Sequence, residues 1–96
     1  MLTIDQIRES VLSLTTRYDV NRVDLFGSYA TNQATVQSDV DFLVEFATPI
    51  PSIFAVMGLK AELSSTLKKE VDVVTVPLVN PDLLHTREVI NIYART

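Results

Sequence analysis

The sequence predicts one α/β domain in which helices cover a small sheet. Short apolar runs typical of buried strands alternate along the chain with segments whose apolar residues recur every three or four positions, as on one face of a helix. This alternation is typical of sheets with helices packed on them. The 96 residues, 47% hydrophobic and 21% charged, suit a single globular domain over residues 1–96.

The first half of the chain is expected to form a helix, a strand and a turn. An apolar stripe at helical spacing predicts a helix over residues 3–18, with Thr3 as its N-cap. Residues 23–26 are expected to form a short buried strand that Gly27 ends. A turn, with at most one turn of helix, is expected over residues 28–34.

The middle of the chain is expected to form a strand over residues 40–46 and a helix over residues 52–68. Pro49 and Pro51 break the chain between them, and Ser52 is the expected N-cap. Apolar positions of this helix are expected to be buried: Ile53, Val56, Met57, Leu63 and Leu67.

The last part of the chain is expected to form a strand over residues 71–76 and a closing helix over residues 82–94. Pro77 would end the strand, and Asn80 and Pro81 are typical of the start of a helix. The elements then follow in the order αβ(α)βαβα.

Composition excludes several classes of protein. The absence of cysteine rules out a disulfide framework and a thiolate metal site. A net charge of -4 disfavours direct nucleic-acid binding. The N-terminus does not resemble a signal peptide, and no apolar run reaches the roughly 18 residues of a membrane span. A cytoplasmic protein is therefore expected, and self-association is left open.

Gly27-Ser28, at the end of the first expected strand, is a candidate phosphate-binding turn. Glycine lets the backbone approach a ligand closely. The amides of the helical turn that follows would point outward, where anions bind well, and the Ser28 hydroxyl can bond a phosphate oxygen. Taken alone, Gly-Ser is more often a plain strand-to-helix turn.

Asp39, Asp41 and Asp72 are candidate metal ligands. On a strand, Asp39 and Asp41 would point to the same face, where a divalent cation would relieve their repulsion. Asp72 is one charge within an apolar strand and is costly to bury unless paired or bound to metal. Carboxylate oxygens suit Mg²⁺. Solvated carboxylates at a strand edge remain the alternative for each of them.

Taken together, these features resemble the nucleotidyltransferase superfamily that includes DNA polymerase β. Gly27-Ser28 after a strand, then ten residues, then Asp39-x-Asp41, then Asp72 in a later strand is the shared pattern. The short length and the run Ser-Asp-Val-Asp-Phe-Leu-Val-Glu-Phe resemble the minimal subgroup, the MNT domains. The resemblance covers nearly the whole chain and implies a small mixed sheet of about three to four strands flanked by helices.

The resemblance implies transfer of a nucleoside monophosphate from a nucleoside triphosphate, with ATP favoured, to a hydroxyl. It assigns nucleotide binding to Gly27, Ser28 and Ser38. Asp39, Asp41 and Asp72 would hold Mg²⁺ and carry catalysis, with Asp72 either sharing the metal or helping to deprotonate the acceptor.

MNT proteins are commonly paired with a HEPN-domain RNase toxin. The resemblance therefore implies an antitoxin that adds AMP to a hydroxyl, tyrosine above all, of such a partner. Neutralisation by binding alone is the alternative, and transfer to a small molecule or RNA is a third. The chain departs from the family at one segment, because the usual Ala-Arg-Gly is here Ala30, Thr31 and Asn32. This departure bears on the rate and the substrate of transfer. Asn32 can still adopt the left-handed conformation.

Overall fold

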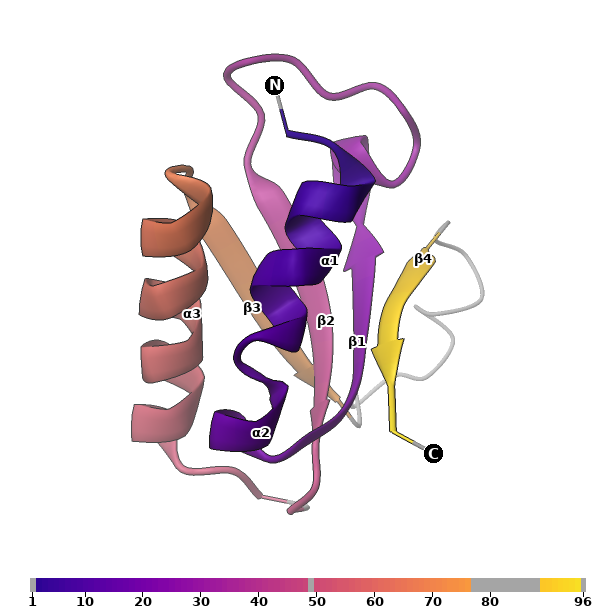
Figure 1. Ribbon diagram of the computed structural model, residues 1–96. Helices are drawn as coiled ribbons and strands as arrows, with labels where there is room; N and C mark the ends of the chain where they lie inside the picture. Colours follow the sequence, from indigo (N-terminus) through magenta and orange to yellow (C-terminus); the bar gives the residue numbers. More distant parts are fainter. Residues whose placement is uncertain (1, 49, 77–88, 96) are drawn as a thin grey trace.

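The computed structural model describes residues 2–48, 50–76 and 89–95, and a four-stranded sheet forms its centre (Figure 1). The strands are β1 (Val20–Phe26), β2 (Val40–Phe46), β3 (Val71–Val76) and β4 (Ile90–Ala94), in the order β3-β2-β1-β4. β2 and β3 are parallel, whereas β1 runs antiparallel to both β2 and β4. The prediction of a small mixed sheet flanked by helices is confirmed.

The first predicted helix is two helices, α1 (Ile4–Leu12) and α2 (Thr15–Tyr18). Thr3 caps α1 as predicted, since its side chain accepts a hydrogen bond from the Gln6 amide in a capping box. The break at residues 13–14 has a local cause. The Ser13 hydroxyl donates to the Ser10 carbonyl at 2.8 Å and the Thr15 hydroxyl to the Leu12 carbonyl at 3.1 Å. Such side-chain bonds compete with the helical ladder.

α3 (Ile53–Leu67) begins after Ser52, whose hydroxyl accepts from the Phe54 amide, as its prediction as N-cap requires. Leu63 and Leu67 are buried as predicted, and Leu59 joins them. The prediction was wrong for Ile53 and Met57, which are 66% and 61% exposed. The first two turns of α3 are apolar on both sides, so periodicity could not indicate which side packs on the sheet. Val56 is half-buried against the core.

The prediction of a helix over residues 82–94 is wrong at its end, because residues 90–94 form β4 beside β1. Ile92 is buried in the core and Ile90 packs against it, whereas Asn91 between them is exposed. This alternation is that of a half-buried strand. The predicted helix start at Asn80 and Pro81, and the strand end at Pro77, lie outside the described residues.

Alternate residues of the sheet form the core beneath the helices. Val40, Phe42 and Val44 of β2 are fully buried and cluster with Leu59 and Leu63 of α3. β2 and β3 have the predicted bounds, while β1 begins three residues before the predicted start at residue 23. No helix in the described part of the chain is long and apolar enough to cross a membrane.

Hydrogen bonds to one carboxylate join α2 to α3. Glu62 of α3 accepts from the Tyr18 hydroxyl and from the Arg17 guanidinium. These two bonds, that of Tyr18 foremost, hold the pKa of Glu62 below its ordinary value. The same bond from its hydroxyl to Glu62 raises the pKa of Tyr18. The two helices are therefore held together by a group that titrates in acid.

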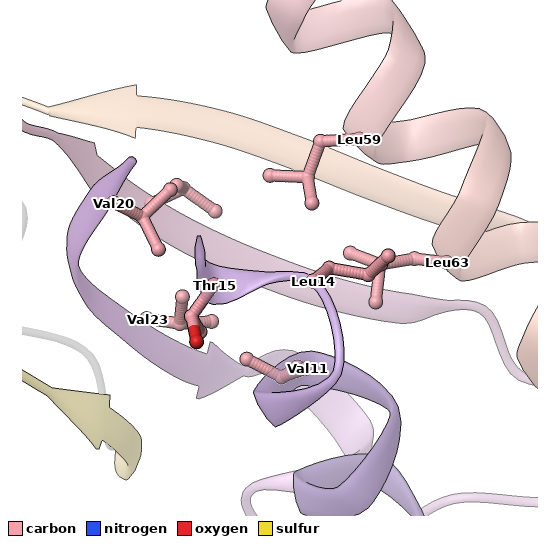
Figure 2. A pocket seen from close by; sticks show the side chains of 8 residues that line it. Val11, Leu14, Thr15, Val20, Val23, Leu59 and Leu63 are labelled. Carbon is pink, nitrogen blue, oxygen red and sulfur yellow. The ribbon is translucent and has the colours of Figure 1, made fainter. Parts of the chain in front are cut away.

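A small cavity of about 10 Å³ lies in the core between the helices and the sheet (Figure 2). Its lining is apolar except for one hydroxyl: Val11, Leu14, Thr15, Val20, Val23, Val44, Leu59 and Leu63. The hydroxyl of Thr15 already donates to the Leu12 carbonyl. A space of this size without several polar partners does not hold an ordered water, so it is a packing void and not a substrate site.

Candidate active site

Two of the candidate aspartates are neighbours on the sheet face opposite the one on which the described helices pack. Asp41 on β2 and Asp72 on β3 are directly paired in the register of these parallel strands. Val40 and Val71, each one residue earlier, are buried in the core. Because side chains alternate along a strand, Asp41 and Asp72 point to the opposite face. The prediction that Asp72 joins the Asp-x-Asp pair on an adjacent strand therefore matches their placement.

Gly27 brings the end of β1 against Asp41. Phe26, the last residue of β1, pairs with Asp41, and the backbone turns at Gly27 with φ of +76°. A methyl group at Gly27 would overlap the Asp41 Oδ2 atom and lie 3.2 Å from Cγ. Both the positive φ and the close approach require glycine here. The 3-10 turn over Gly27–Tyr29 then places the half-buried Ser28 beside the same edge of the site.

Asp39 lies on the loop that enters β2, with its side chain exposed. Ser38 closes a turn just before it, because its hydroxyl accepts from the Thr35 amide at 2.8 Å and its amide donates to the Thr35 carbonyl at 3.1 Å. On the other side, the Val40 amide donates to the Glu70 carbonyl at 3.0 Å. The structure therefore gathers Gly27, Asp39 and Asp41 with Asp72 at one end of the sheet.

The donor set fits a hard divalent cation in its chemistry, and two of its members are neighbours in the sheet. Asp41 and Asp72 put like charges at adjacent positions of one face, which a cation between them would offset. Carboxylate oxygens are the ligands that Mg²⁺ prefers. Among the described residues, however, no three histidine, cysteine or carboxylate side chains already converge closely enough to hold an ion. The metal role of the three aspartates stays a prediction.

The turn survives the departure from the Ala-Arg-Gly segment. Asn32 adopts a φ of +61°, the left-handed conformation expected of it. The Thr31 hydroxyl contacts the Gly27 and Ser28 carbonyls at 3.3 and 3.4 Å, and the Gln33 amide donates to the Ser28 carbonyl at 2.9 Å. The Thr31 hydroxyl thus bonds back to the turn, and the Gly-Ser geometry is kept without a cation at this position.

No sequence pattern pointed to Asp24, which is only 7% exposed on β1. Its carboxylate accepts from Arg22 Nε at 2.9 Å and from Asn91 Nδ2 at 2.9 Å. Asp24 lies two residues before Phe26 and therefore shares a sheet face with Asp41. A charge inside an apolar strand with arginine two residues earlier was the available signal. The bond from Asn91 joins β1 to β4.

The comparisons with known proteins agree with this geometry. Residues 4–95 match the family described as the nucleotidyltransferase domain. The chain belongs to this family. A relative from Thermococcus cleftensis, the protein adenylyltransferase MntA, is 39% identical over 79 residues, which are 77% of this chain and 78% of that protein. The predicted fold family and the prediction of a nucleotidyltransferase are confirmed.

Solved structures place the fold in the same group. One that is provisionally described as a minimal nucleotidyltransferase superposes with a TM-score of 0.76 at 33% identity, covering 93% of this chain and 95% of that one. Another contains a tri-AMPylated Shewanella oneidensis HEPN toxin in complex with an MNT antitoxin. Its TM-score is 0.70 at 20% identity, covering 97% of this chain and 74% of that one, so it supports the fold alone.

Proposed function

We propose that this nucleotidyltransferase is an antitoxin that transfers AMP from ATP to a tyrosine hydroxyl of a HEPN-domain toxin in the cytoplasm. The relative named a protein adenylyltransferase supports AMP transfer to a protein. The neighbour solved with an AMPylated HEPN toxin suggests the kind of partner, and tyrosine is what the resemblance to MNT domains implies. The observation that carries the proposal is the pairing of Asp41 with Asp72 in register, with Gly27 packed against Asp41.

In this proposal the turn and the aspartates divide the work. The backbone at Gly27 and the hydroxyls of Ser28 and Ser38 hold the triphosphate, because they offer donors beside the carboxylates. Asp39 and Asp41 would hold Mg²⁺. When bound, Mg²⁺ neutralises charge that develops on the phosphate oxygens. Asp72 completes the site, either as a further ligand or as the group that receives the proton of the acceptor hydroxyl.

The transfer is an in-line displacement at the α-phosphorus. The tyrosine oxygen forms a bond to the α-phosphorus, the bond from that phosphorus to the oxygen leading to the β-phosphate breaks, and pyrophosphate leaves. The hydroxyl proton goes to Asp72 or to water. In such transfers the protein contributes mainly positioning and electrostatic stabilisation. Two side chains paired across β2 and β3 supply rigid positions for both tasks.

Neutralisation by binding alone is the second candidate, and one observation favours it. Thr31 stands where relatives of the MNT subgroup carry arginine, and its hydroxyl bonds back to the turn. A charge-assisted contact to phosphate is worth about 1–3 kcal/mol, so its absence would slow transfer by about fivefold to 150-fold. A slow enzyme could still silence its partner by covering it.

Intact mass spectrometry of the partner separates the two candidates. The purified chain would be incubated with Mg²⁺, ATP and a HEPN protein encoded beside it. The proposal expects AMP-sized additions that disappear with the Asp39→Asn, Asp41→Asn double variant. Glu45→Gln is the matched control, because Glu45 is exposed on the same strand and face as Asp41. If the wild-type chain and the double variant both form a tight complex with the partner and neither adds AMP, neutralisation by binding is the function that remains.

A further inference from the structure

Lys69 links the junction between α3 and β3 to the loop that carries Asp39. Its amide donates to the Ser64 carbonyl at 3.3 Å, and its carbonyl accepts from the Ser64 hydroxyl at 2.6 Å. The backbone of Lys69 is thus fixed at the end of α3. From there its ammonium donates to the Val36 carbonyl at 2.7 Å, a contact between residues 33 positions apart.

Two bonds from consecutive residues bracket Asp39. Lys69 Nζ holds the Val36 carbonyl, three residues before Asp39. The Glu70 carbonyl holds the Val40 amide at 3.0 Å, one residue after it. Glu70 is followed by Val71 and then by Asp72, so the segment that presents Asp72 also fixes the segment that presents Asp39.

The loop is ordered by hydrogen bonds, both its own between Thr35, Gln37 and Ser38 and the one from Lys69. The Val36 side chain is 74% exposed, and Gln37 and Asp39 are exposed as well. Apolar burial therefore contributes little at residues 36–39, and hydrogen bonds must offset the entropy of ordering them. A bond from an ammonium to a carbonyl is charge-assisted and among the stronger ones available.

We propose that Lys69 is a positioning residue that fixes the Val36 carbonyl and thereby limits the motion of Asp39 at the start of β2. The proposal rests on the proposed function in one respect, namely that Asp39 is a metal ligand. Lys69 does not touch the nucleotide in this proposal. It acts through the backbone of the loop, by limiting the number of conformations that Asp39 samples before a cation arrives.

Amide hydrogen exchange on the nucleotide-free and metal-free chain tests the anchor directly. Lys69→Met keeps the length of the side chain but removes its donor, and we expect about tenfold faster exchange at the Thr35 and Ser38 amides. Lys68→Met is the matched control, since it changes the net charge equally and Lys68 donates no side-chain bond in the described part of the structure. Lys69→Arg should restore slow exchange, because a guanidinium can still donate to the carbonyl.

A Mn²⁺ titration followed by line broadening of the Asp39 and Val40 amides tests the consequence. We expect Lys69→Met to need about tenfold more Mn²⁺ for half-maximal broadening, and Lys68→Met to resemble the wild type. Equal exchange rates in the two variants, or faster exchange of β1 and β2 along with the loop in Lys69→Met, would overturn the proposal. Neither measurement requires AMP transfer, so a chain that transfers no AMP would refute the proposed function without deciding the role of Lys69.

Discussion

Replacing Gly27 by alanine perturbs the site at the point where the turn meets Asp41. The backbone there has φ of +76°, and holding an L-residue in that region costs about 1–2 kcal/mol. The added methyl overlaps Asp41 Oδ2, so the carboxylate must rotate away. Because only the end of the Asp41 side chain has to move, we expect the backbone strain at positive φ to account for most of the loss of stability. Unfolding free energy should fall by about 1–2 kcal/mol, which for a domain of this size lowers Tm by roughly 4–16 °C.

Activity should fall much further than stability. A displacement of about 1 Å at a reacting centre can cost about a hundredfold in rate, and the rotated carboxylate of Asp41 is displaced by at least that much. The assay is the rate of AMP addition to the partner, measured by intact mass at a temperature where the variant is fully folded. Thermal unfolding of the same sample verifies that condition.

The other glycine of the chain provides the matched control. Gly58 lies within α3, where an added methyl would lie 2.9 Å from the Tyr18 hydroxyl oxygen on the helix-covered side of the sheet. We expect Gly58→Ala to alter stability by no more than about 1 kcal/mol and to leave transfer unchanged. If Gly27→Ala transferred AMP at the wild-type rate, the argument that Gly27 shapes the Asp41 carboxylate would be refuted.

Three further substitutions test separate parts of the fold. Thr3→Ala removes the capping box of α1 and should lower the unfolding free energy in urea by about 1 kcal/mol; no change would mean that the cap contributes nothing. Lys68→Gly relieves a residue with φ of +57° at the end of α3 and should raise Tm, by the equivalent of about 0.5–1 kcal/mol. Glu62 has a lowered pKa, so its contribution to stability is present above the ordinary carboxyl pKa and is lost as the pH falls through the folded value. Glu62→Gln should therefore flatten the acid side of the stability profile measured by urea unfolding from about pH 6 to 3, and parallel profiles would contradict the role of the Tyr18 and Arg17 bonds.

Local signals in the sequence predicted the elements whose causes are local. Thr3 and Ser52 cap helices as expected, because a cap depends on residues within one turn. β2 and β3 were predicted with their observed bounds, since each run follows a charged residue and has a proline at or soon after its end. Residues 90–94 were assigned to a helix because nothing near them indicates that β1 leaves an edge to be paired. Strand pairing is a property of the tertiary fold and overrides local propensity.

Some residues of the candidate site could likewise be predicted from local motifs, whereas their contacts depend on the tertiary fold. Gly27, Ser28 and the Asp39-x-Asp41 pair are short motifs and could be found by inspection. Asp41 and Asp72 are neighbours only because β2 and β3 lie side by side in this register. These strands are separated by α3 along the chain, and the sequence does not show that they are adjacent in the sheet. The contact of Lys69 with the Val36 carbonyl has no sequence signal, because its partner is a backbone atom far away in the chain.

β4 is the last described strand, yet it pairs with β1, which is the first. During synthesis the N-terminal part of a chain is released first, so β1 waits with one edge unpaired until residues 90–94 leave the ribosome. An unpaired edge is a template for pairing with another chain. A messenger RNA cut short before codon 90 would encode all three aspartates of the site and still expose that edge. We expect its product to sediment as aggregate.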